Sequence, residues 1–228
     1  MPVMALFFPV DVAVSLTAIV HLLNNLLKLM MFARHAVRRV LIPFAATAIP
    51  SALLGSWLLI WLSGQEPLFT YQMFGAEPSV TLLNAVLACL MIVFALVEVL
   101  PRLRNLSFSP RLVPVGGILS GFFGGLSGHQ GALRSAFLVR AGLSKEQFIG
   151  TGVVIACLVD IARLILYESR IGTMAAEELR LLVVAAGSAF LGTALGARFL
   201  RRVTLGGIQA MVSLLLFSIA VALGAGLI

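Results

Sequence analysis

Long apolar runs, each close to the length of a membrane-crossing helix, alternate with short polar segments along this chain of 228 residues. A bilayer core about 30 Å thick is crossed by about 20 apolar residues in a helix. The runs are continuous and do not alternate with period two, which favours helices over a transmembrane barrel. The pattern predicts six spans, at residues 11–32, 40–62, 80–100, 147–167, 179–200 and 205–228.

The composition agrees with this pattern and excludes two other classes of protein. Hydrophobic residues make up 61% of the chain and charged residues 11%, and the mean hydropathy is +1.09. Soluble domains have roughly 45–50% apolar and about 25% charged residues, and disordered chains have low hydrophobicity. We therefore expect an all-α polytopic membrane protein that is embedded in the lipid bilayer.

The chain has a net charge of +7, and the positions of its basic residues indicate how it is oriented in the membrane. Because the basic residues lie in separate loops and form no single patch with aromatic residues, nucleic-acid binding is not expected. Basic residues concentrate in cytoplasmic loops, so the side that carries twelve of the 16 is predicted to be cytoplasmic. These twelve are Lys28, Arg34, Arg38, Arg39, Arg102, Arg104, Arg111, Arg140, Lys145, Arg198, Arg201 and Arg202.

A glycine-rich segment at residues 112–141 must then begin and end on the cytoplasmic side. Glycine weakens a helix and lets backbones approach closely. We expect a re-entrant hairpin of two short helices that breaks near residues 127–131; an ordinary pair of helices with glycine-rich packing is the alternative. The seven glycines of this segment are Gly116, Gly117, Gly121, Gly124, Gly125, Gly128 and Gly131.

The two halves of the chain, residues 1–104 and 105–228, align loosely at an offset of 135. This alignment places Asn25 opposite Asp160 and gives the halves opposite orientations in the membrane. Inverted repeats of this kind are common in secondary transporters, whose substrate site lies near mid-membrane and uses broken helices. Nothing in the first half corresponds to residues 111–135, so the partner of the glycine hairpin is missing or lies upstream of Met1.

Two stretches resemble the sulfite exporter TauE/SafE family. The first is Gly-Phe-Phe-Gly-Gly-Leu-Ser-Gly at residues 121–128 with residues 136–152, and the second is residues 21–28 with 32–35. The resemblance covers nearly the whole chain. It departs from the family in the absent first hairpin and at residues 128–131, where family members often have more glycines. It implies a multi-pass transporter of the bacterial inner membrane for small anions such as sulfite or organosulfonates.

Polar residues at membrane depth are the candidates for substrate binding, because charges there are costly and are usually paired or functional. Asp160 and Arg163 share a helix face and are either a neutralised structural pair or an anion-binding arginine with its orienting carboxylate. Arg163 is also near enough to a span end to extend toward the surface. Asn25 and Lys28 occupy the repeat-related positions, where an interhelical hydrogen bond and an extended surface lysine are the alternative roles.

His129, Gln130 and Arg134 lie at or just after the predicted break. The free N–H groups at the start of a helix attract anions, and an arginine adds charge and a forked donor. His129 is a candidate for proton coupling, since histidine titrates near neutral pH. The alternative is that His129 and Gln130 only satisfy the broken backbone.

The leading hypothesis is a secondary transporter of small anions that works by alternating access. An intramembrane enzyme is disfavoured, because the chain lacks a His-Glu-x-x-His motif and Ser127 lies only two residues from His129. A cation or metal carrier is disfavoured by the scattered histidines, and we expect no metal and no cofactor. An inactive, shortened transporter subunit and a homo-oligomer that supplies the missing hairpin stay open.

Overall fold

The computed structural model describes most of the chain as helices. The described residues are 4–6, 8–72, 77–100, 107–171, 180, 183–185, 187–188, 191–192 and 205–228. The predicted span at residues 179–200 therefore lies largely outside the described residues. Five of the twelve basic residues on the predicted cytoplasmic side also lie outside them: Arg102, Arg104, Arg198, Arg201 and Arg202.

The helices follow the apolar runs closely, so the predicted helical class is confirmed. The elements are η1 (Met4–Leu6), α1 (Val10–Phe32), η2 (Ala33–His35), α2 (Arg38–Ser63), β1 (Pro67–Thr70), β2 (Ser79–Thr81), α3 (Leu82–Val99), η3 (Pro110–Leu112), α5 (Val113–Ser127), α6 (Gly131–Leu138), α7 (Lys145–Ile171) and α9 (Leu205–Gly224). Three helical segments of the described chain are long and apolar enough to cross a membrane. They are Val10–His35, Arg38–Ser63 and Lys145–Glu168.

Helices α2 and α5 pack side by side in the same direction through a row of glycines. Gly117, Gly121 and Gly125 are four residues apart on α5 and so share one helix face. Gly121 lies on the backbone of Ala48, and Gly125 lies one turn further along on the backbone of Ala52. A Cβ atom at either glycine would collide with that backbone. We call this row of three glycines and the α2 backbone beneath it the glycine seam.

Helices α1 and α7 pack side by side in opposite directions. Near the start of α7, Gly150 lies against the backbone of Phe32 at the end of α1. Further along α7, Asp160 accepts a hydrogen bond from Asn25, which lies earlier in α1. Successive contacts along α7 therefore fall on progressively earlier residues of α1, as they do in an antiparallel helix pair.

Helices α5 and α6 form a hairpin that returns to the end where it began. Gly128 ends α5 in the left-handed conformation (φ 77°), which glycine adopts without steric cost. The N–H of Phe108, just before α5, donates to the carbonyl of Ala136 in α6 at 3.1 Å. Gly116 likewise faces the ring of Phe137. The chain therefore breaks within residues 127–131, where the glycine pattern predicts it.

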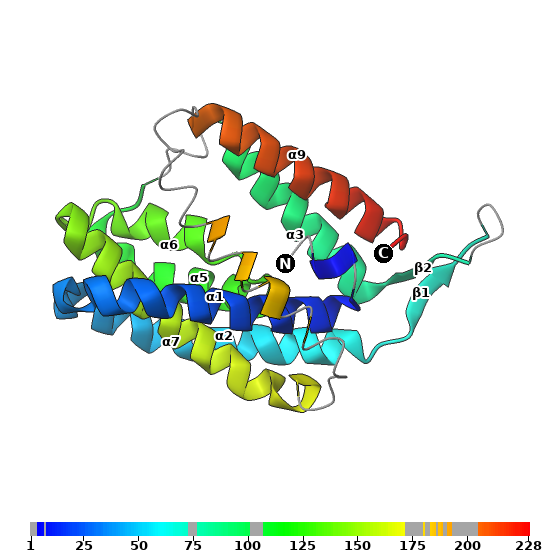
Figure 1. Ribbon diagram of the computed structural model, residues 1–228, viewed down its shortest axis with the longest axis horizontal. Coiled ribbons are helices and arrows are strands. Elements are labelled where there is room, and N and C mark those ends of the chain that lie inside the picture. Colours follow the sequence, from blue (N-terminus) through cyan, green and yellow to red (C-terminus); the bar gives the residue numbers. More distant parts are fainter. Residues whose placement is uncertain are drawn as a thin grey trace.

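Helices α3 and α9 form a second antiparallel pair, drawn apart from α1, α2 and α7 in Figure 1. Gly224 at the end of α9 contacts Ala88 near the start of α3. Next to this end the strands β1 and β2 project as an antiparallel hairpin, with Phe69 paired to Val80. The sequence did not predict these strands, because four and three residues are too few to establish a period-two pattern.

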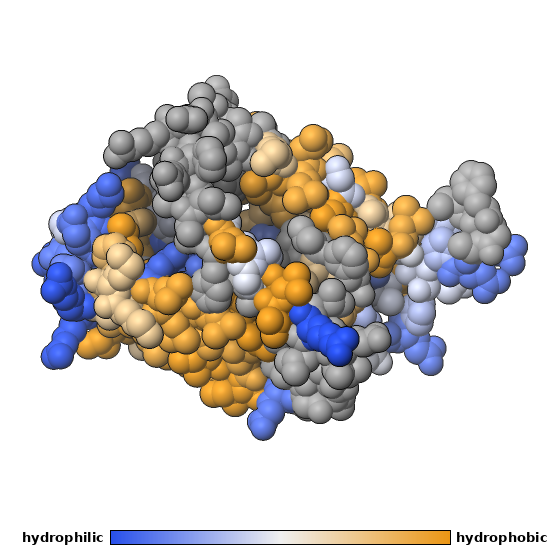
Figure 2. Space-filling view, viewed as in Figure 1, coloured by the Kyte–Doolittle hydropathy of each residue, from blue (hydrophilic) through white to orange (hydrophobic). Residues whose placement is uncertain are grey.

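Apolar side chains of the described residues fill three buried clusters and also cover much of the surface. The largest joins α1, α2, α3 and α9 around Leu87 and Met91, a second joins α2, α6 and α7 around Phe44 and Val159, and a small third one packs η1 against α1. Figure 2 shows hydrophilic residues toward the ends of the long axis and hydrophobic residues over much of the face between them. Apolar patches of this extent mark a surface that meets lipid or protein.

The glycine seam predicts a sharp contrast between two glycine substitutions. Gly121→Val should lower the free energy of unfolding by about 2–3 kcal/mol, because its side chain must displace the backbone of Ala48. Gly131→Ala is the control, since no atom lies within 4 Å of a Cβ built there. Denaturant titration in detergent measures both variants. Equal effects of the two substitutions would contradict the close packing of α2 and α5.

Candidate functional site

One face of α7 carries three buried polar side chains to the break between α5 and α6. Asp160, Arg163 and Tyr167 are spaced three and four residues apart, so they lie one above the other on the helix. All three have an exposed fraction of 0%. The break is therefore in contact with the polar stripe of α7 and closed off from the surface on that side.

Asp160 and Arg163 form an ion pair, and Arg163 also holds the end of α5. The guanidinium Nη2 atom lies 2.8 Å from the carboxylate Oδ1 atom. Its Nη1 atom donates to the carbonyl oxygen of Gly124 at 3.2 Å, and the Tyr167 hydroxyl donates to the carbonyl of Gly125. The Gly124 carbonyl also accepts from the Gly128 N–H at 3.0 Å, whereas the carbonyls after it have no N–H one turn further along α5. Because the end of a helix carries partial negative charge, both donors stabilise the end of α5.

The Asp160 carboxylate joins three parts of the fold. Besides Arg163, it accepts hydrogen bonds from the Gln130 Nε2 atom at 3.0 Å and from the Asn25 Nδ2 atom at 3.1 Å. Gln130 belongs to the break, Asn25 to α1 and Asp160 to α7. A buried carboxylate is tolerated when it is paired and its oxygens accept hydrogen bonds, and both conditions are met here.

Arg134 brings a second positive charge to this network. Its Nη1 atom donates to the Gln130 Oε1 atom at 3.3 Å, so the Gln130 amide bridges Arg134 and Asp160. A Cβ atom at Gly152 would lie 3.6 Å from the Nε atom of Arg134, so the Arg134 side chain lies against α7. Two guanidinium groups and one carboxylate therefore meet at the break, and the network carries a net positive charge.

The first turn of α6 adds backbone donors beside Arg134. Gln130 precedes this helix and forms no capping hydrogen bond with its side chain, whose atoms bond Asp160 and Arg134. The Arg134 N–H donates to the Gln130 carbonyl, but the N–H groups before it have no carbonyl one turn back in α6. The start of α6 therefore combines an arginine with the positive end of a helix dipole, an arrangement suited to an anion.

His129 lies at the break but points to a different neighbour. Its ring stacks on Phe94 of α3, with centroids 5.2 Å apart and an interplanar angle of 12°. Its Nδ1 atom lies 3.1 Å from the Ser127 carbonyl and 3.3 Å from the Ser127 hydroxyl, closer than the spacing in sequence suggested. That hydroxyl donates to the carbonyl of Phe123, so its proton is directed away from the ring.

Five of the seven predicted site residues meet in one hydrogen-bonded network, and two lie outside it. The network contains Asn25, Gln130, Arg134, Asp160 and Arg163. His129 contacts α3, as described, and Lys28 is half-buried on α1. Arg163 is buried against Gly124 and does not extend to the surface.

Sequence reasoning missed two residues that hold the hairpin. Tyr167 follows Asp160 by seven residues, so its helical spacing was a usable signal. The Ser120 hydroxyl donates to the carbonyl of Gln130 at 3.1 Å, and no sequence pattern distinguished that serine. No group of three or more His, Cys, Asp or Glu side chains suited to a metal ion occurs among the described residues.

Comparison with known proteins adds one finding to this geometry. The family model described as "Sulfite exporter TauE/SafE" matches residues 1–223. Searches among curated proteins and among solved structures gave no match.

Removal of the Asp160 charge should destabilise the fold strongly. Asp160→Asn leaves the Arg163 guanidinium buried without its counter-charge, at an expected cost of about 3–5 kcal/mol of unfolding free energy. The double variant Asp160→Leu/Arg163→Met removes both charges and should lose less. Thermal or denaturant unfolding in detergent measures both.

The matched control is Glu146→Gln, which removes an exposed carboxylate from the same helix. It should change the unfolding free energy by less than about 0.5 kcal/mol. A Glu146→Gln loss as large as that of Asp160→Asn would show that the buried pair has no special role in stability.

Proposed function

This chain belongs to the sulfite exporter TauE/SafE family, and from that membership we propose that it is a secondary transporter of a small sulfur oxyanion. Sulfite and organosulfonates are the substrates considered first, since they share a compact anionic head of oxygen atoms on sulfur. The membrane is proposed to be the inner membrane of a bacterium, which the chain crosses several times. The apolar helices α1, α2 and α7 support membrane insertion.

The observation that carries this proposal is the excess of positive charge at a chain break among apolar helices. Arg134 and Arg163 face a single carboxylate, that of Asp160, and all three belong to one hydrogen-bonded network. Arg134 is partly buried, and an uncompensated charge is costly at membrane depth, so a network with one extra cation favours an anion as its ligand.

Arg134 and the start of α6 are proposed to contact the substrate directly. Both Nη atoms of Arg163 already donate to protein atoms, Asp160 and the Gly124 carbonyl. The Arg163 Nε atom has no hydrogen-bond partner among the described residues and can add one donor. Arg163 and Asp160 thus position the hairpin, while Arg134 and the first N–H groups of α6 receive the oxyanion.

An inverted repeat and alternating access fit the way that α1 meets α7. The alignment at offset 135 equates Asn25 with Asp160, and these two side chains are hydrogen-bonded to each other. Equivalent residues of two antiparallel helices meet in this way where a two-fold axis passes between the helices. In transporters built from inverted repeats, such an axis lies in the membrane plane and the substrate site lies beside it.

A second function, hydrolysis by Ser127 and His129, has one contact in its favour. Their side chains lie 3.3 Å apart. A histidine base must accept the serine proton, however, and this hydroxyl donates to the Phe123 carbonyl at 3.0 Å. Proton coupling of transport through His129 is the role that we prefer for this residue.

Arg134→Gln should lower the rate of sulfite flux into proteoliposomes at least about tenfold. The loss of one charged donor to an anion is worth about 1.5–3 kcal/mol, and 1.4 kcal/mol corresponds to a factor of ten. Arg140→Gln is the matched control, because Arg140 is exposed after the end of α6. Thermal unfolding of both variants establishes that they are folded.

Two results would contradict the proposed function. One is equal flux through the Arg134→Gln and Arg140→Gln proteins. The other is the absence of flux of sulfite, organosulfonates and other sulfur oxyanions through folded wild-type protein.

The orientation is tested by labelling single cysteines in spheroplasts with a membrane-impermeant maleimide. In a background with Cys89 and Cys157 replaced by serine, Leu68→Cys in β1 should react from outside the cell. Arg38→Cys at the start of α2 should react only after permeabilisation, because basic ends face the cytoplasm. The reverse labelling pattern would overturn the orientation.

A further inference from the structure

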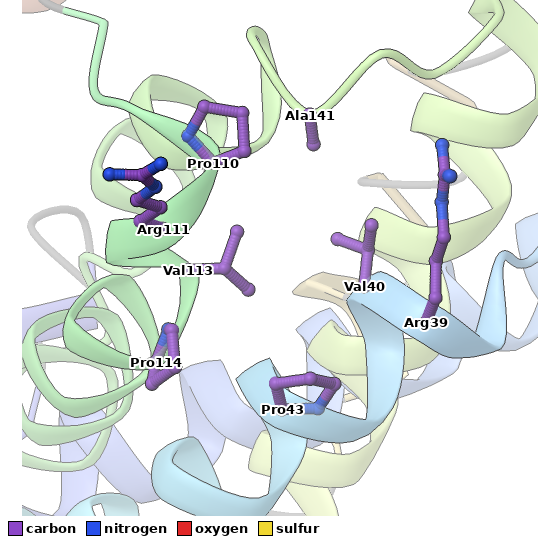
Figure 3. A pocket seen from close by; sticks show the side chains of 8 residues that line it. All are labelled: Arg39, Val40, Pro43, Pro110, Arg111, Val113, Pro114 and Ala141. Carbon is purple, nitrogen blue, oxygen red and sulfur yellow. The ribbon is translucent and has the colours of Figure 1, made fainter.

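A cavity of about 460 Å³ opens between the first turn of α2 and the start of α5, far along α5 from the broken helix. Figure 3 shows Arg39 and Arg111 on opposite sides of it, with valine and proline side chains between them. The described residues that line it are Arg39, Val40, Pro43, Pro110, Arg111, Val113, Pro114 and Ala141. About 20 Å of helix separates Val113 from Ser127, so this cavity is distinct from the proposed substrate site.

Positive charge at this cavity comes from two independent sources. Arg39 and Arg111 are exposed arginines from separate elements, and none of the described residues that line the cavity is acidic. Helices α2 and α5 run in the same direction, so both present the positive ends of their dipoles here. Helix N-termini usually carry acidic residues, yet the first turns of α2, η3 and α5 contain none.

The floor of the cavity is apolar and closed. Val40, Pro43, Val113 and Pro114 line it below the arginines. Beneath them, the Thr47 hydroxyl donates to the Pro114 carbonyl at 2.8 Å, and the glycine seam begins. The cavity is therefore a blind pocket with a basic rim, and it offers no path along the contact between α2 and α5.

We propose that this cavity binds the headgroup phosphate of an anionic phospholipid, with Arg39 and Arg111 as the two donors and the apolar floor beneath the first acyl carbons. A free inorganic anion would use the arginines but not the valines and prolines. Basic pockets between helices at the cytoplasmic face of a membrane have this combination of charge and apolar surface. The inference rests on the membrane location and orientation of the chain and is independent of the transported substrate.

Binding of a short-chain phosphatidylglycerol to the purified protein, measured by native mass spectrometry, tests the proposal. Arg39→Gln/Arg111→Gln should weaken binding at least tenfold, and Arg39→Lys/Arg111→Lys should recover part of the affinity because the charge returns. The matched control Arg34→Gln/Arg38→Gln removes two exposed arginines that do not line the cavity and should bind as the wild type does.

Competition by other ligands distinguishes the sources of the phosphate. Neither inorganic phosphate nor phosphatidylcholine of the same chain length should displace phosphatidylglycerol when each is present at tenfold excess. Displacement by inorganic phosphate would show a small-anion site, and displacement by phosphatidylcholine would show an apolar groove without charge recognition. Either result, or equal weakening by the control pair, would overturn the proposal.

Sulfite flux through the same variants separates this inference from the proposed function. Arg39→Gln/Arg111→Gln should transport within about twofold of wild type in liposomes of phosphatidylcholine, where no anionic lipid is present. Flux in that preparation also shows that the variant is folded. Loss of lipid binding with retained flux supports the cavity as a lipid site and leaves the transport proposal unaffected.

Discussion

The buried ion pair between Asp160 and Arg163 is the interaction on which the arrangement around the broken helix depends. A helix that ends inside the fold leaves carbonyl groups without partners, and such groups are costly away from water. Tyr167 donates to one of these carbonyls, that of Gly125, and Arg163 adds a second donor to the Gly124 carbonyl, which also accepts from the Gly128 N–H. Asp160 in turn neutralises Arg163. The same carboxylate also accepts hydrogen bonds from Gln130 and Asn25. Asp160 of α7 is therefore bonded both to the break and to α1.

This polar network lies next to the glycine seam, and the two features meet at the end of α5. Small residues let α5 approach α2 closely enough for dispersion contacts along the whole helix, which is how helices associate in lipid. Gly128 then ends α5 beside the polar stripe of α7. Tyr167 marks the junction, because its hydroxyl donates to Gly125, a member of the seam.

Several features of this architecture were readable from the sequence, because they follow from local rules. Apolar length located the helices, and Gly128 marked the break because few other residues adopt its left-handed conformation. The helical spacing of Asp160 and Arg163 placed both on one helix face and made an ion pair one of the two roles considered for them. The hydrogen bond from Asn25 to Asp160 joins residues far apart in the sequence, so no local rule predicts it. Only the repeat alignment indicated a relation between the two residues, because it placed them at equivalent positions.

Other parts of the structure depend on tertiary packing that no local pattern encodes. The stacking of His129 on Phe94 joins residues from the break and from α3, and neither sequence stretch indicates the other. The cavity between Arg39 and Arg111 arises because α2 and α5 run in the same direction, a fact that hydropathy cannot supply. The strands β1 and β2 were too short to be distinguished from a loop.

The glycine seam also bears on which parts of the molecule we expect to move together. Because three successive turns of α5 lie against the backbone of α2, a separation of these two helices would lose contacts along most of α5, and we expect them to move as a pair. The pair α3 and α9 has much less backbone contact with α2, and its ring contact with the break is Phe94 on His129. A displacement of α3 relative to α2 and α5 would therefore change that ring stack, so we expect the surroundings of His129 to change with any such movement.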